Sequence, residues 1–275
     1  MAAGTRTTDE RRTGGFLALL ILLMIVIGGV GMTVMAKTRW WLPPVASAHG
    51  GDIDRLFYIT LIVTGLVFVL VHVLLALFVW QNAAWGDRRA EHWHEHQTLE
   101  LSYTIIPAIV LAILVSMGGV VWHRVHAAPP ASALAVDLRG EQFAWLARYP
   151  GADGAFGRID PAKIDARTNP MGIDPGDPAG SDDIVTRELH LVVNRPVEVR
   201  LRARDVLHSF FVPAFRVKQD VVPGMTVTTW FTPTKAGDYE IACAELCGVG
   251  HYIMRGKIKV ETQEAFDAWL AGQKK

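Results

Sequence analysis

The chain has 275 residues, of which 27 are basic and 27 are acidic. Because these charges cancel, no net charge draws the chain to nucleic acid or to an anionic surface. Hydrophobic residues make up 51% of the sequence, a share too high for a disordered chain or an ordinary cytosolic domain. The composition therefore predicts that part of the chain lies in a membrane and that nucleic acid is not a partner.

Three apolar stretches are long enough to cross a bilayer, which takes roughly 20 residues of helix. They cover residues 16–36, 56–80 and 103–122. The first could be a secretory signal cleaved at Ala46-Ser47-Ala48 or a retained helix. Its length, and the basic and Trp residues between 37 and 41, favour a retained helix. The sequence thus predicts two or three transmembrane helices within residues 1–127.

The loop between the second and third stretches predicts the orientation. It contains Arg88 and Arg89, and positive residues prefer the cytoplasmic side. Everything after the third stretch is then outside, in the periplasm or its equivalent. This places the C-terminal domain, residues 128–275, on the periplasmic side of a bacterial inner membrane.

The sequence of this domain predicts a set of short strands. Between Val197 and Ala203, apolar and charged residues alternate strictly, which is typical of a strand with one buried face. Further strands are predicted at 189–193, 226–231, 238–243 and 253–261, with a short helix after them. Such closely spaced strands indicate a β-sandwich or barrel.

A long loop rich in Gly, Pro and Asp is predicted at residues 151–183. Its carboxylates could form a docking patch for a basic partner, or they could simply be solvated. They are Asp174, Asp177, Asp182 and Asp183.

The segment from Cys243 to Met254, with His208 upstream, combines two thiols, two imidazoles and one thioether. Copper prefers these soft and borderline ligands, and the Met argues against zinc. A mononuclear blue-copper site needs one Cys, and the surplus thiolate of Cys247 suits two metals sharing bridging sulfurs. A disulfide between the two cysteines would leave the His and Met spacing unexplained, and a haem attachment motif does not fit.

With these residues the chain closely resembles subunit II of the cytochrome c oxidases, from about Leu56 to the C-terminus. The resemblance implies a cupredoxin-like Greek-key β-sandwich that carries a dinuclear copper centre, CuA. The implied ligands are two bridging thiolates, two imidazoles, a weakly bound thioether and a backbone carbonyl. They belong to Cys243, Cys247, His208, His251, Met254 and Glu245. The side chain of Glu245 is further implied to reach a magnesium ion shared with subunit I.

Two other segments extend the resemblance. Glu100 lies seven residues before Pro107, and the family has such a Glu at the mouth of a proton pathway in subunit I. Where the family has Gln-Trp-Tyr-Trp on an early strand, this chain has Gln142-Phe-Ala-Trp145. Electrons enter at the first Trp in the family, so the resemblance points here to Phe143, with entry through Trp145 or directly at the edge of the copper centre as the alternatives.

The resemblance implies a subunit that takes electrons from a c-type cytochrome and passes them to haem in subunit I. Oxygen would be reduced to water in that other subunit, coupled to proton transport. Two alternatives remain: a CuA subunit of a nitric oxide reductase and a membrane-anchored copper carrier. A quinol-oxidising subunit, which lacks the copper ligands, is excluded by the complete ligand set.

Overall fold

The computed structural model describes residues 3–38, 40–82 and 94–273. The chain divides into two compact units. One consists of Met1–Leu42 and Arg55–Gly119, and the other of Pro43–Asp54 and Val120–Lys275. Arg88 and Arg89, which carry the predicted orientation, lie outside the described residues.

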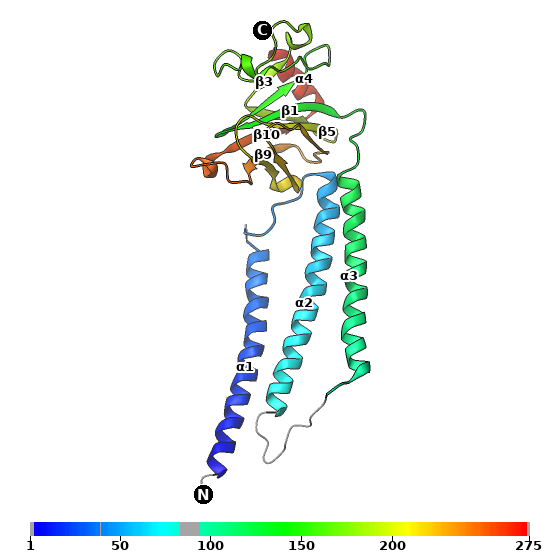
Figure 1. Ribbon diagram of the computed structural model, residues 1–275, viewed down its shortest axis with the longest axis vertical. Coiled ribbons are helices and arrows are strands. Elements are labelled where there is room, and N and C mark those ends of the chain that lie inside the picture. The colour runs from blue at the N-terminus through cyan, green and yellow to red at the C-terminus, as the bar shows by residue number, and fades with distance from the viewer. Residues whose placement is uncertain (1–2, 39, 83–93, 274–275) are drawn as a thin grey trace. The chain divides into compact units, whose positions relative to one another are not determined.

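The first unit is built on three long helices (Figure 1). They are α1 (Ala3–Ala36), α2 (Ala48–Asn82) and α3 (Gln97–Val125). Each is long and apolar enough to cross a membrane. Within the described chain α3 buries none of its side chains, so its apolar surface needs lipid or another protein around it. The prediction of two or three spans is confirmed, with three.

The second unit is a sandwich of two five-stranded sheets. The first sheet has the order β3 (Ile184–Thr186), β2 (Ala144–Tyr149), β1 (Leu134–Glu141), β5 (Val197–Ala203) and β8 (Val227–Phe231). The second has the order β4 (Glu188–Val192), β10 (Arg255–Glu261), β9 (Gly237–Cys243), β6 (His208–Val212) and β7 (Val217–Val221). The pairs β1–β5 and β4–β10 are parallel, and the other pairs are antiparallel. The predicted cupredoxin-like sandwich is confirmed.

The core lies between the sheets. On β5 the side chains of Val197, Val199 and Leu201 are completely buried, as their alternation predicts. Phe210 of β6 and Phe231 of β8 meet them with stacked rings 6.3 Å apart. The closing helix α4 (Gln263–Gly272) buries Phe266, which contacts Tyr149. Burying so many aliphatic and aromatic side chains supplies the main stabilising term, about 25 cal/mol for each Å² of apolar surface.

The loop at 150–183 contains two short turns of 3₁₀ helix, Pro161–Lys163 and Pro178–Gly180. Its carboxylates are used within the loop and against the sheet. Asp174 and Asp177 pair with Arg158, while Asp183 pairs with Arg148 of β2 and has a fully buried side chain. The interpretation of these aspartates as a docking patch is therefore wrong for Asp183, because a buried ion pair cannot meet a partner.

The segment Pro43–Asp54, which includes the first residues of α2, belongs to the same compact unit as the sandwich. The backbone of Ala46 is hydrogen-bonded to Ala214 and to Thr234, both at 2.8 Å. Arg216 holds the segment through Asp54 and the carbonyl of Pro43, with N···O distances of 2.7 Å to each. The sequence pattern gave no sign of this contact.

Candidate metal centre

The centre is formed where two strands of the second sheet meet one loop. β9 ends at Cys243 and β10 begins at Arg255, so residues 244–254 form the loop between them. β6 starts at His208, with Phe210 in register with Cys243. The N–H of Cys243 donates to the carbonyl of Met254 at 3.3 Å and closes the loop. These strand pairs fix both ends of the loop.

The two cysteines are free, and their sulfur atoms lie 3.9 Å apart. Each sulfur has its own imidazole and its own weaker donor. Nδ1 of His208 lies 3.8 Å from Sγ of Cys243, and the carbonyl oxygen of Glu245 lies 3.2 Å from the same sulfur. The Sγ of Cys247 is 3.6 Å from Nδ1 of His251 and 3.7 Å from Sδ of Met254. The site therefore consists of two similar halves joined by a pair of thiols.

The ligand atoms are withdrawn from solvent. His208 is completely buried, Met254 is 1% exposed and Cys247 is 4% exposed. Burial raises the pKa of the Cys247 thiol to about 11, and the neighbouring Cys243 adds to the effect. Thiols with such a pKa stay protonated near neutral pH unless a cation replaces the proton. The two adjacent thiols, the imidazoles and the thioether fit copper.

Asp205 sets the orientation of His208. Its Oδ1 accepts from Nε2 of His208 at 2.8 Å, and its Oδ2 accepts from the backbone N–H of Gln142 at 2.8 Å. With the proton on Nε2, Nδ1 is left as a lone pair that faces Cys243. Burial alone would raise the pKa of Asp205, but these hydrogen bonds and one from the N–H of Val206 lower it below its usual value. The sequence analysis missed Asp205, which is three residues from a recognised ligand.

The turn between β1 and β2 covers the loop. Nε2 of Gln142 donates to the carbonyl of Cys247 at 2.5 Å. The ring of Phe143 packs on Gly250, where an added Cβ would lie 2.4 Å from the ring. Gly248 has φ +136°, and an added Cβ there would lie 2.8 Å from Nε2 of Gln142. Both positions thus require glycine, and the aromatic ring at 143 rests directly on the ligand loop.

The other predicted residues lie in three places. Trp145 is buried on the inner face of β2, and its ring centroid is 6.2 Å from that of His208. The carboxylate of Glu245 accepts from Nζ of Lys218 at 3.1 Å. Glu100 belongs to the other unit, in the first turn of α3, where its Oε1 accepts from the N–H of His96 at 3.3 Å.

Comparisons with known proteins agree with this arrangement. Residues 173–262 match the family described as cytochrome c oxidase subunit II, periplasmic domain, and residues 35–117 match its transmembrane domain. A protein named alternative cytochrome c oxidase subunit 2, from Bradyrhizobium diazoefficiens, is 40% identical over 257 residues, covering 93% of this chain and 91% of the relative. Cytochrome c oxidase subunit 2 of Thermostichus vulcanus is 33% identical over 263 residues, covering 83% of this chain and 77% of the relative.

Among solved structures, the periplasmic domain of subunit II of cytochrome oxidase from Bradyrhizobium japonicum is 30% identical, with a TM-score of 0.40. The match covers 53% of this chain and 96% of that domain. The sequence relatives span nearly the whole chain, and the two family matches fall on its helical part and on its sandwich. The chain therefore belongs to the family of cytochrome c oxidase subunit II, a subunit of an oxidoreductase complex with transmembrane helices and a periplasmic domain.

Proposed function

We propose that this subunit holds a dinuclear copper centre, CuA, and is the electron acceptor of a cytochrome c oxidase in a bacterial inner membrane. The observation that carries the proposal is the paired geometry of the two thiols, since each has one imidazole and one weak donor within 4 Å. When bound, the copper pair supplies a one-electron carrier between a c-type cytochrome and haem in subunit I. We assign its ligands to Cys243, Cys247, His208, His251, Met254 and the carbonyl of Glu245.

The protein contributes rigidity. Both ends of the ligand loop are hydrogen-bonded to strands, and Gln142 holds the carbonyl of Cys247 between them. Asp205 keeps His208 in one tautomer and one orientation. Ligands that are held nearly still move little when charge arrives or leaves, so the site favours fast transfer.

The ring of Phe143 marks the face where electrons enter. It is half-buried and rests on the ligand loop, whereas Trp145 is only 3% exposed and lies behind it against His208. Around the loop Leu246, Val249 and Tyr252 are 81%, 93% and 77% exposed. An apolar surface of this kind suits a partner protein, and we place the donor cytochrome there.

Two further roles follow from the family. We propose that Glu100, at the start of α3, serves as a proton collector for a pathway in subunit I, where oxygen is reduced and proton transport takes place. We also propose that Glu245 reaches a magnesium ion shared with subunit I. Its carboxylate is 36% exposed and pairs with Lys218, so the ion would replace that ammonium group.

The proposal is tested by copper loading of the full chain purified in detergent. One unpaired electron shared equally by two copper nuclei gives a seven-line hyperfine pattern in electron paramagnetic resonance, while a single copper gives four lines. We expect seven lines for the wild type and at most a four-line signal for Cys247→Ser, with unchanged circular dichroism. Two bound coppers and a seven-line spectrum in Cys247→Ser would refute the bridging role.

A further inference from the structure

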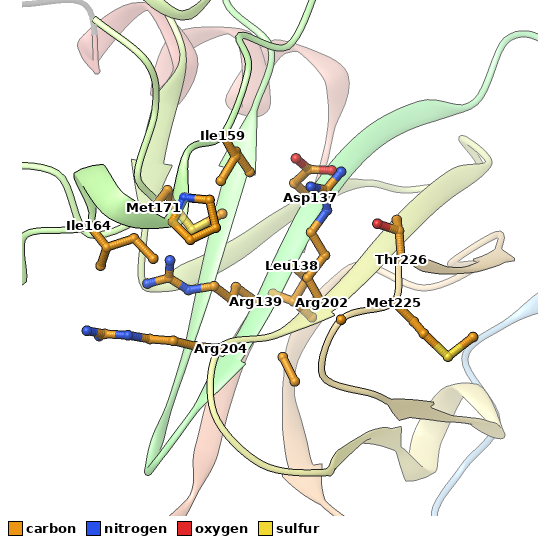
Figure 2. A pocket seen from close by; sticks show the side chains of 13 residues that line it. Asp137, Leu138, Arg139, Ile159, Ile164, Met171, Arg202, Arg204, Met225 and Thr226 are labelled. Carbon is orange, nitrogen blue, oxygen red and sulfur yellow. The ribbon is translucent and has the colours of Figure 1, made fainter.

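A cavity of about 250 Å³ lies on the outer face of the first sheet and shares no lining residue with the metal centre. Charged side chains from neighbouring strands line it. Asp137 and Arg139 come from β1, and Arg202 and Arg204 come from β5 and the residue after it. Figure 2 shows that Arg139 and Arg204 extend toward the side of Ile164, whereas Asp137 lies on the other side. Three arginines around one small space indicate an anionic ligand.

Several of these polar groups are buried without a hydrogen-bond partner among the described residues. Arg139 is 5% exposed, and its Nη2 donates to Glu141, but its Nε and Nη1 have no acceptor. Nε of Arg202 also has no acceptor, and Oδ1 of Asp137 has no donor. Because such groups lose free energy when they are buried unpaired, they indicate a ligand that both accepts and donates hydrogen bonds.

The strand register gives a second reason to expect an anion in the cavity. Arg139 and Arg202 are directly in register on the parallel strands β1 and β5, and both line the same cavity. Like charges at such positions repel each other. Glu141 pairs with Arg139 and Arg204, and no ion pair joins a carboxylate to Arg202 in the described part of the chain.

The side chains that line the cavity carry more positive than negative charge. Three arginines, Arg139, Arg202 and Arg204, line it together with one carboxylate, Asp137, while Glu141 and Asp205 lie near Arg139 but outside the lining. An anion with an exchangeable proton balances both the charge and the hydrogen bonds.

The remaining walls limit the size of the ligand. Ile164 and Met171, from the loop at 150–183, lie on one side, and Met225 lies on the other (Figure 2). The volume is below the roughly 300 to 1,000 Å³ of pockets for drug-sized molecules. Part of this wall comes from residues before 173, where the match to the periplasmic family begins.

We propose that this space, the arginine cavity, binds a protonated phosphate group. Its oxygen atoms accept from Arg139 and Arg202, and its P–OH donates to Oδ1 of Asp137. The carboxylate provides selectivity, because sulfate carries no proton near neutral pH and would leave Asp137 facing a second anion. Both free phosphate and a small phosphate ester offer this group at about pH 6, the second pKa of a phosphate ester, so the binding measurements are made there. The proposal does not depend on the copper centre.

The test is calorimetric titration of the full chain in detergent with inorganic phosphate, phenyl phosphate and sulfate at equal ionic strength. We expect saturable one-to-one binding of at least one phosphate probe, and the tighter of the two identifies free phosphate or an ester as the source. Sulfate should bind at least about tenfold more weakly, since one charged hydrogen bond is lost. No saturable binding, which would mean that water alone fills the cavity, overturns the proposal. Equal binding of sulfate also overturns it.

A matched pair of variants separates the site from general charge effects. Arg202→Gln should weaken phosphate binding about tenfold or more. Arg200→Gln removes the same charge from the same strand, but Arg200 pairs with Glu198 outside the cavity, so its effect should stay below about twofold. Equal weakening by both variants would show that only the overall charge attracts phosphate.

A thermal measurement covers the case in which a variant folds poorly. In buffer without phosphate or sulfate, Arg202→Gln should melt no lower than wild type, because it relieves the repulsion with Arg139. Phosphate should raise the melting temperature of wild type but not of this variant. A variant that melts lower in both buffers, by the same amount, would show that Arg202 is structural.

Discussion

Asp205→Asn tests how the protein sets the orientation of a copper ligand. Asp205 accepts three hydrogen bonds, from His208 Nε2, Gln142 N–H and Val206 N–H, each at 2.8 Å. Asparagine has nearly the same shape but only one acceptor oxygen, while its amide nitrogen only donates. If the oxygen faces His208, the amide group meets the N–H of Gln142. If the amide is reversed, His208 must move its proton to Nδ1, the atom that faces Cys243.

Either arrangement should lower the affinity of the centre for copper. A hydrogen bond to a charged group contributes about 1.5 to 3 kcal/mol, and loss of the group that orients a metal-bound histidine lowers metal affinity by about 10- to 100-fold. These ranges agree, because about 1.4 kcal/mol corresponds to a factor of ten. We therefore expect the copper affinity of Asp205→Asn to fall by about one to two orders of magnitude.

The assay is competition for copper between the full chain and a chelator of known affinity, followed by the absorption of the thiolate–copper bands. Asp238→Asn is the matched control, since Asp238 is exposed at the opposite end of β9 from Cys243. An affinity of Asp205→Asn within about twofold of wild type would show that packing alone orients His208, and the assignment of Asp205 as its positioning residue would fail.

Three other substitutions test single residues. Met254→Leu should keep copper bound but shift its reduction potential, because the thioether is a weak ligand. Met225→Leu, at an exposed site, is the control. Loss of copper from Met254→Leu would show that Met254 is more than a weak ligand. Glu100→Gln should slow oxygen consumption while the reduction of copper by cytochrome c in rapid mixing stays normal; an equal slowing of both would mean that Glu100 acts through structure. Trp145→Phe should slow the reduction of copper several-fold without changing its spectrum; unchanged kinetics at low donor concentration would leave Phe143 as the contact point.

The sequence predicts a strand correctly where apolar and polar residues alternate, because one face of such a strand is buried in the core. Apolar and charged residues alternate from Val197 to Leu201, and the apolar ones are buried as expected. The turn before this strand contains Asn194, which has φ 60°. The ligand residues could be recognised because copper requires particular atom types at short spacing. The strand that begins at His208 was not predicted, since β6 packs on both sides and its run of apolar residues has no alternation.

The supporting contacts could not be predicted in the same way. Asp205 and Gln142 are 63 residues apart, and only the folded sandwich shows that one holds the other. The aspartates of the loop at 150–183 have the composition of a solvated surface, but pairing with Arg148 and Arg158 depends on how the loop returns to the sheet. Composition alone gives no information on such long-range pairing.

The position of Pro43–Asp54 bears on the processing and membrane topology of the chain. The residues considered as a signal-peptidase site, Ala46-Ser47-Ala48, are part of the sandwich, with Ala46 2% and Ser47 5% exposed. A peptidase needs an extended, accessible segment, and a cut after Ala48 would detach the backbone that bonds to Ala214 and Thr234. Because this segment and residues 120–275 share one unit, they must face the same aqueous compartment. α2 and α3 must therefore cross the membrane as a hairpin, whatever the charge of the loop between them.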